Sequence, residues 1–415
     1  MKNNSQYDLV VIGGGASGMM AAGTAGAQGK KVLLLEKNAR LGEKLRITGG
    51  GRCNVTNAEY DIHKLLSNYG KAKDFLYSPF SQFGVKDTFD FFEKRGMPLI
   101  IEARKRAFPH TQKANDIFKV MEKYLAETGN VTVETNSEVV SVPLENGKIE
   151  KIISRSGEYR AEKYIFATGG MSAPKTGSTG DGFKWLNRLG HRVAESNPNI
   201  VPLEMHDSWM KRLAGVSLSF MKITFFMDGK KEFSKTGKIL FTHFGLSGPL
   251  ILNSSSQVSE LLKHGEVTCT IDMYPDTDMG SMQKNILNIF EANKNKMLKN
   301  VLPILCPKGL APGMMVLLSD ELLQTKVHSI SKEDRKEFAN LFKAMPGTVA
   351  GLMGYDRAVV SDGGVVLEEI DTKTMQSKKI SNLYVTGDLL HINRPSGGFS
   401  LQMCWTTGFV AGNNI

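Results

Sequence analysis

The chain has 415 residues, a formal net charge of +10 and 41% hydrophobic residues. It is long enough for two or three domains with ample cores, and no apolar stretch reaches the length of a membrane span. Its four cysteines form no CxxC pair and no metal-like cluster, which argues for a reducing compartment and against a thiol-exchanging oxidoreductase. Nothing at the start of the chain resembles a signal peptide, so we expect a cytoplasmic protein without membrane contact.

The positive charge has three interpretations: a nucleic-acid partner, an anionic substrate, or a solvated surface. The lysines are scattered along the chain, as in Lys284–Lys308, rather than gathered in one run. This distribution favours the solvated surface and makes a nucleic-acid partner the weaker expectation. The sequence indicates no oligomeric state.

The strongest local pattern lies near the start of the chain. The apolar run Asp8–Ile12 predicts a buried parallel strand, and Gly13–Gly18 follows at once with the spacing G-x-G-x-x-G. A small-residue helix is expected from about residue 17 to 28. The run Val32–Leu35 predicts a second buried strand, which ends at Glu36. A strand, a glycine turn, a helix and a closing acid together predict a dinucleotide site.

Each position in this pattern has a physical role. Gly13 permits the tight turn, and Gly15 lets the backbone approach a pyrophosphate. The N–H groups at the helix start, from Ala16 and Ser17, have no partners within the helix and can face the phosphates. Glu36 can accept hydrogen bonds from ribose hydroxyls and would repel a 2′-phosphate, which disfavours NADP. The motif alone does not separate FAD from NAD.

A second glycine-rich segment follows. Three successive glycines, residues 49–51, are flanked by Arg46 and Arg52, and Asn54 comes soon after. Such a loop can wrap closely around a flat polar ligand, and the two arginines can meet phosphate or the edge of a ring. The alternative is a surface loop without a ligand, which would not need so many hydrogen-bonding residues.

The run Gly49–Asn57 reads G-G-G-R-C-N-V-T-N, and this signature resembles a family of two-domain flavoproteins. These are NAD(P)/FAD-dependent oxidoreductases of the aminoacetone-oxidase-like or bile-acid-reductase-like type, and the resemblance covers roughly the whole chain. It implies that Val139 holds the adenine, that Thr168–Gly170 returns the chain to the cofactor, and that Asp388 binds a ribityl hydroxyl. It also implies that the helix opening near Gly398 faces the flavin pyrimidine.

Motifs and resemblance together predict a non-covalent FAD site. Its expected contacts are Gly13, Gly15, Ala16, Ser17, Glu36, Lys37, Lys44, Arg46, Thr48, Gly49, Gly50, Gly51, Arg52, Asn54, Val139, Thr168, Gly169, Gly170, Gly387, Asp388, Gly398 and Phe399. No metal site is expected. The chain departs from the family near its end. The family usually has Glu where this chain has Asp388, Asn where it has Ser400, and a more acidic loop in place of Ile392–Ser396. These departures bear on the substrate rather than on the FAD contact.

The remaining pattern predicts the architecture. Residues 58–127 are expected to be mainly helical, and Asp181 is preferred as the N-cap of a following helix rather than as a catalytic group. We expect an α/β fold with a Rossmann-like FAD-binding domain of three layers and a mostly parallel sheet. Residues 1–194 and 346–415 would form this domain. Residues 195–345 would form an inserted substrate domain, with strands at about 195–275 and helices at about 277–345.

Four separated segments converge on one dinucleotide, which favours FAD over a nicotinamide bound in one contiguous fold. The sequence contains no second fingerprint, so NAD(P)H would enter only transiently. We expect an FAD-dependent oxidoreductase acting on a small molecule. The alternatives are a tRNA-modifying flavoprotein and a non-catalytic flavin sensor. His243, in a Thr-His-Phe-Gly turn, is the candidate proton donor or substrate-positioning residue; alternatively, it only fixes its turn.

Overall fold

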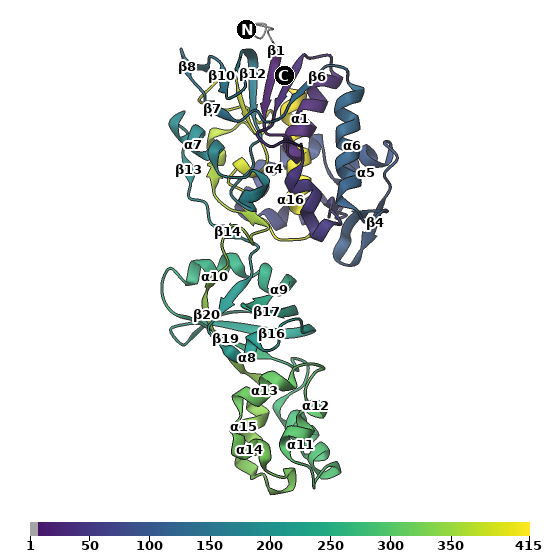
Figure 1. Ribbon diagram of the computed structural model, residues 1–415, viewed down its shortest axis with the longest axis vertical. Coiled ribbons are helices and arrows are strands. Elements are labelled where there is room, and N and C mark those ends of the chain that lie inside the picture. Colours follow the sequence, from purple (N-terminus) through teal and green to yellow (C-terminus); the bar gives the residue numbers. More distant parts are fainter. Residues whose placement is uncertain (1–6) are drawn as a thin grey trace. The chain divides into compact units, whose positions relative to one another are not determined.

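The computed structural model describes residues 7–415 and divides the chain into two compact units (Figure 1). Unit 1 combines the segment that ends at Pro198 with Val359–Ile415, and unit 2 is Asn199–Ala358. The boundaries predicted after residues 194 and 345 therefore fall 4 and 13 residues early (198 − 194 and 358 − 345). The larger shift arises because β20 (Met345–Leu352) pairs with strands of unit 2 rather than returning to unit 1.

Unit 1 is built on a parallel sheet of five strands in the order β23-β12-β1-β2-β6. The central strand β1 pairs in parallel with β2 on one side and β12 on the other. Residues 9–12 of β1 and all of β2 are buried, as expected where helices cover both faces of a parallel sheet. This confirms the predicted Rossmann-like α/β fold. The strands are β1 (Tyr7–Ile12), β2 (Val32–Leu35), β6 (Val131–Glu134), β12 (Ala161–Phe166) and β23 (Leu383–Val385).

The two ends of the chain meet in unit 1, where α1 (Ala16–Ala27) packs against α16 (Phe399–Asn413), purple and yellow in Figure 1. Two glycines of α16 allow this close approach. A Cβ atom added at Gly408 or at Gly412 would lie 2.4 Å from a backbone carbonyl oxygen of α1. The last helix of the chain therefore completes the core around the helix that begins the glycine fingerprint.

The region 58–127 is mainly helical, as predicted, but it also contains two strands that the sequence did not indicate. Residues 99–109 form an antiparallel hairpin, β4 (Leu99–Glu102) and β5 (Arg106–Pro109), to which β3 (Thr56–Asn57) adds. Ile100 and Ile101 are β-branched, and residues 99–101 pair directly with residues 107–109, which decides the local structure. The helices of the region are α3 (Ile62–Leu66), α4 (Lys73–Gln82), α5 (Val85–Glu93) and α6 (Ala114–Glu127).

Several short elements complete unit 1. Strands β7 (Val139–Ser141), β10 (Ile152–Ser154) and β11 (Glu158–Tyr159) form a small antiparallel sheet. Helix α2 (Glu43–Ile47) precedes the glycine-rich loop, and α7 (Asp181–Arg188) follows the turn after β12. The strands β21 (Val360–Ser361) and β22 (Gly364–Val365) lead the chain back from unit 2.

Unit 2 contains a closed barrel in the order β15-β18-β17-β16-β19-β20. The Asp228-Gly229 pair, both with positive φ, joins β16 to β17 as the sequence predicted. The other strands are β15 (Leu203–Met205), β16 (Ser217–Met227), β17 (Lys230–Thr242), β18 (Gly245–Ser247) and β19 (Val267–Asp272). Its helices are α8 (Ser208–Lys211), α9 (Pro249–Leu252), α10 (Ser255–Leu261), α11 (Met279–Ala292), α12 (Leu298–Leu305), α13 (Ala311–Leu317), α14 (Asp320–Gln324) and α15 (Lys332–Lys343).

No helix among residues 7–415 is long and apolar enough to cross a membrane. Within the same range, no group of three or more His, Cys, Asp or Glu side chains is arranged to hold a metal ion.

Candidate functional site

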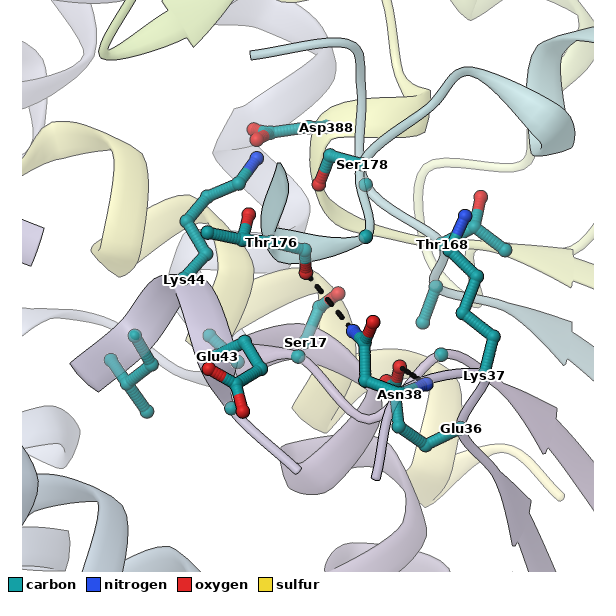
Figure 2. Close-up of a pocket in the computed structure, with 18 of the residues that line it drawn as sticks. Ser17, Glu36, Lys37, Asn38, Glu43, Lys44, Thr168, Thr176, Ser178 and Asp388 are labelled. Carbon is teal, nitrogen blue, oxygen red and sulfur yellow. Dashed lines mark hydrogen bonds between the residues drawn. The ribbon is translucent and has the colours of Figure 1, made fainter. Parts of the chain in front are cut away.

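A cavity lies in unit 1 where β1, β2 and β12 end at their carboxyl termini (Figure 2). Ile12 and Gly13, Leu35 and Glu36, and Ala167 and Thr168 line it from these three strand ends. Ligands of open parallel α/β sheets bind at this edge, because loops and helix N-termini converge there. The other lining segments are residues 15–17, 37–38, 42–45, 48, 137–139, 169, 176–179, 181, 185, 359–360, 388, 400–401 and 404.

The start of α1 forms one wall of the cavity. Its N-cap is Gly15, in extended conformation, and no side chain caps the helix. Ala16 and Ser17 line the cavity, and the first turn carries no acidic residue. A Cβ atom added at Gly15 would meet nothing within 4 Å. The helix therefore presents free N–H groups and its positive dipole end to open space, which suits a pyrophosphate.

Glu36 lies at the end of β2 and is buried. Its Oε2 accepts from the Gly14 N–H at 2.8 Å, and its Oε1 accepts from the Asn38 N–H at 2.8 Å. Burial raises the pKa of Glu36, although the two backbone N–H groups and Lys37 oppose this shift. The carboxylate is fixed by the backbone, and each oxygen keeps acceptor capacity for a hydroxyl pair.

The segment after β2 is tied to the turn before α7. The Asn38 side chain donates to the Thr176 carbonyl at 3.1 Å, as Figure 2 shows. The Lys37 ammonium donates to Thr179 Oγ1 at 2.6 Å and to Asp181 Oδ2 at 2.9 Å. These bonds draw two segments, far apart in sequence, to the same part of the cavity.

Asp181 is not an N-cap, contrary to the prediction. The cap of α7 is Gly180 in left-handed conformation, and Asp181 is the first helical residue. Burial raises the pKa of Asp181, but hydrogen bonds from Thr179 and Lys37 outweigh it and the net pKa is lowered. Its carboxylate serves the ion pair with Lys37.

A second charged group lies where Lys44 and Asp388 line the cavity. Lys44 Nζ donates to Ser172 Oγ at 3.1 Å, and in Figure 2 its ammonium end points towards Asp388. Burial lowers the pKa of Lys44, and the charge of Asp388 opposes this shift. Asp388 also forms an ion pair with Arg394. Two cations and one carboxylate therefore meet at this part of the site.

The polar groups that line the cavity fit FAD. It combines helix N–H groups for phosphate, the Glu36 carboxylate for a ribose, and Asp388 for a polyhydroxyl chain. The hydroxyl of Thr168 is buried in the cavity wall without a hydrogen-bond partner in the structure, which leaves a polar group for a ligand to satisfy. The open space at Gly15 is the further room that a pyrophosphate needs.

The structure brings twelve of the predicted cofactor residues to the cavity. These are Gly13, Gly15, Ala16, Ser17, Glu36, Lys37, Lys44, Thr48, Val139, Thr168, Gly169 and Asp388. The other ten predicted residues are not among its lining residues. These are Arg46, Gly49, Gly50, Gly51, Arg52, Asn54, Gly170, Gly387, Gly398 and Phe399.

The two arginines have protein partners. The Arg46 guanidinium lies 3.6 Å from the centre of the Phe118 ring and donates to Asn115 Oδ1 at 2.7 Å. The Arg52 guanidinium lies 4.2 Å from the centre of the Phe108 ring and pairs with Glu102. In this structure both side chains brace the glycine-rich loop instead of reaching the cavity.

Five of these ten residues have backbone or packing roles in this structure, namely Gly49, Gly50, Gly51, Gly398 and Phe399. All three loop glycines have positive φ, which explains the glycine requirement without a ligand contact. Gly398 is the N-cap of α16, and an added Cβ would lie 2.3 Å from the backbone of Thr56. The ring of Phe399 is buried against Tyr69, whose hydroxyl donates to the Phe399 carbonyl at 2.8 Å.

His243 belongs to unit 2, in the turn between β17 and β18, and its side chain is exposed. Its ring lies 4.9 Å from that of Phe244. The cavity residues all belong to unit 1, so the role of His243 remains a proposal.

Sequence reasoning did not single out several lining residues. Asn38, Trp185 and Cys404 line the cavity, and none belongs to a short motif with a known spacing. One signal was available, because Asn38 comes two residues after the closing acid of the fingerprint. Cys404 could not be found from sequence, since it depends on the packing of α16 beside α1.

Residues 7–414 match the model of a protein family, the HI0933-like protein Rossmann domain. The chain belongs to this family. It is therefore a flavoprotein of the oxidoreductase class, with FAD as the cofactor that suits its Rossmann domain. The family match confirms the resemblance that the glycine-rich signature indicated.

Two curated relatives align over nearly the whole chain. The ribosomal RNA dihydrouridine synthase of Escherichia coli is 28% identical over 99% of this chain and 98% of that protein. The 3-dehydro-bile acid delta(4,6)-reductase of Clostridium scindens is 27% identical over 97% of both chains. Among solved structures, 3-ketosteroid delta1-dehydrogenase of Sterolibacterium denitrificans matches with a TM-score of 0.52 and 13% identity, over 99% of both chains. That last likeness concerns the fold alone.

Proposed function

We propose that this flavoprotein is a reductase that transfers hydride from reduced FAD to a carbon–carbon double bond conjugated with a carbonyl group. The names of the two full-length relatives support this class of reaction. A dihydrouridine is a uridine whose ring double bond, conjugated with a carbonyl, has been reduced, and a 3-dehydro delta(4,6) bile acid carries the same kind of conjugated system. The observation that carries the proposal is the cavity at the strand ends, with free helix N–H groups and Glu36 at its walls.

The protein's part in this reaction is binding, orientation and electrostatics. FAD, when bound, supplies the hydride chemistry. The α1 N–H groups of Ala16 and Ser17 would hold the pyrophosphate, and Glu36 would accept from the adenosine ribose. Asp388 would accept from the ribityl chain. Lys44, a half-buried cation that lines the cavity, would favour negative charge there.

NAD(P)H is the proposed reductant. The chain carries one dinucleotide fingerprint, so the nicotinamide would bind only during its own half-reaction. Anaerobic mixing of the yellow holoprotein with NADH and with NADPH tests this step by loss of flavin absorbance. Reduction by neither cofactor at rates compatible with turnover would contradict it.

The first candidate substrate is a small conjugated ketone. The reduced holoprotein should be reoxidised anaerobically by enones or dienones, with a product two hydrogens heavier by mass spectrometry. A panel should contain cyclic enones, steroid-like dienones and saturated ketones as negative controls. Reoxidation by oxygen alone, with every enone inert, would contradict this substrate class.

A second candidate, a uridine within RNA, is favoured by the outward face of the barrel in unit 2. Lys222, Lys231 and Lys238 lie on β16 and β17, and none of their ammonium groups forms an ion pair or a hydrogen bond with residues 7–415. Phe220, with 52% of its surface exposed, lies on β16 as well. Unpaired lysines beside an exposed aromatic ring suit phosphates and unstacked bases.

The RNA candidate is tested by binding to a ribosomal RNA transcript at several salt concentrations. The double variant Lys222→Glu and Lys238→Glu should weaken binding and reduce the slope of log K against log salt by about 1 to 2. Lys284→Glu on α11 is the matched control, because Lys284 is also exposed but lies outside the barrel. Equal loss in both variants, or no affinity for RNA, would contradict a dedicated RNA face.

A further inference from the structure

Arg394 is the most deeply buried cation near the cavity, with 1% of its side-chain surface exposed. It does not line the cavity itself. Its Nη2 pairs with Asp388, its Nε donates to Ser400 Oγ at 3.0 Å, and its Nη1 donates to the Ile392 carbonyl at 2.6 Å. The planar guanidinium thus uses all three of its nitrogens on fixed acceptors.

Both side-chain partners of Arg394 line the cavity. Asp388 and Ser400 line the cavity, one after the end of β23 and the other in the first turn of α16. Arg394 therefore joins the two segments that close this part of the site.

The charges near Arg394 do not cancel. Asp388 contributes one negative charge, while Arg394 and Lys44 contribute two positive charges. Cys404, which also lines the cavity, is affected by all three: burial and Asp388 raise its pKa, Arg394 and Lys44 lower it, and the result is about 12. Two-electron reduction adds negative charge to a flavin ring, and buried cations stabilise such charge more strongly than solvated ones do.

We propose that Arg394 is a positioning residue of the flavin site, which holds Asp388 and Ser400 in place and makes the bound FAD easier to reduce. The inference rests on the placement of FAD in this cavity. Arg394 acts through its two partners and through its charge, and it makes no direct contact with the reacting atoms. The loop Ile392–Ser396 is then part of the cofactor site, although its backbone does not line the cavity.

The test is the midpoint potential of the protein-bound flavin, measured by dye equilibration under anaerobic conditions at about pH 8, where carboxyl groups are ionised. Arg394→Gln should shift the potential to more negative values, and Asp388→Asn should shift it to more positive values. Arg394→Lys keeps the positive charge but loses the planar, forked set of N–H donors. The flavin potential of this variant should therefore stay near that of the wild type, while its thermal stability falls.

Arg192→Gln is the control, because it also breaks an arginine–carboxylate ion pair but its partner, Glu369, does not line the cavity. Its potential should equal that of the wild type. An unchanged potential in Arg394→Gln with FAD bound would overturn the proposal and leave Arg394 a structural brace. If Arg394→Gln retains no FAD, the other two variants test the proposal. An unchanged potential in Asp388→Asn, or a large negative shift in Arg394→Lys, would overturn the proposal. A wild-type protein without FAD would instead contradict the cofactor site itself.

Discussion

The backbone N–H of Gly14 donates to Oε2 of Glu36 over 2.8 Å, which links the glycine turn after β1 to the end of β2. Asn38 fixes the other carboxylate oxygen in the same way. Glu36 is thereby held in one orientation before any ligand arrives. Because the Glu36 carboxylate is already ordered, its side chain loses little conformational entropy when a ligand binds. This favours recognition of a ribose hydroxyl pair.

We predict that Glu36→Ala lowers the affinity of the apoprotein for FAD by about 1–3 kcal/mol, since ribose hydroxyls would lose their acceptor. Fluorescence titration of apoprotein with FAD measures this change. Glu59→Gln is the control, because Glu59 pairs with Lys105 and does not line the cavity. Equal dissociation constants for Glu36→Ala and the wild type would remove Glu36 from the ligand contacts.

Gly15→Val should abolish FAD binding while the fold persists. The backbone at Gly15 is extended with φ −80°, so valine is tolerated there, and its side chain would project into open cavity space. Gly351→Val in β20 is matched to it, because an added Cβ there also meets nothing within 4 Å. Flavin content after purification separates the two variants. Normal flavin in Gly15→Val would show that no pyrophosphate approaches this position.

The fold was largely predictable because its signals are local. The parallel strands β1 and β2 are continuous apolar runs, and the fingerprint between them fixes the direction of α1. The hairpin at residues 99–109 was missed because its strands are stabilised by pairing with each other rather than by a hydrophobic period. The end of unit 2 was misplaced for the same reason, since only pairing assigns β20 to the barrel.

The candidate site was predictable where a residue's role follows from its place in a motif, as for Gly15 and Glu36. It was less predictable for charged side chains. Arg46 and Arg52 were expected to meet the ligand, but each stacks on a phenylalanine instead. Sequence spacing cannot tell which of several nearby partners a long side chain will reach. Arg394 was not singled out, because its partners are brought together only by the fold.

Stability should fall on acidification through His191. His191 Nδ1 lies 2.8 Å from Glu369 Oε2, and its Nε2 lies 2.9 Å from Ser377 Oγ. Burial lowers the pKa of His191 below 6.5, although Glu369 opposes this shift. The unfolded chain then takes up the proton first, so the stability that His191 contributes is complete above about pH 6.5 and is lost as the pH falls through the folded-state pKa.

Thermal melting between about pH 7.5 and 5 tests this titration. The variant His191→Asn keeps a donor for Glu369 but cannot titrate, so its melting temperature should depend less on pH in this range. A wild-type profile as flat as that of the variant would contradict the assignment. The pKa of Glu369 is lowered to about 2, because its bonds to Lys379, Arg192 and His191 outweigh burial, so Glu369 titrates outside this window.

His243→Gln tests whether this exposed histidine of unit 2 donates a proton to the substrate. If it does, the variant should keep its FAD content and spectrum, and its substrate half-reaction should slow by roughly 10²-fold. A slower reduction by NAD(P)H with a normal substrate step would place His243 at the reductant site. Unchanged rates in both half-reactions would leave it the role of fixing its turn.

The central claim is that the cavity at the strand ends of unit 1 holds FAD. The most direct measurement is to denature the purified protein and to identify and quantify the flavin that it releases. We predict FAD at about one molecule per chain, after reconstitution if necessary, as the single Gly13–Glu36 fingerprint implies. Release of FMN alone, or no bound flavin after incubation with excess FAD, would contradict the claim.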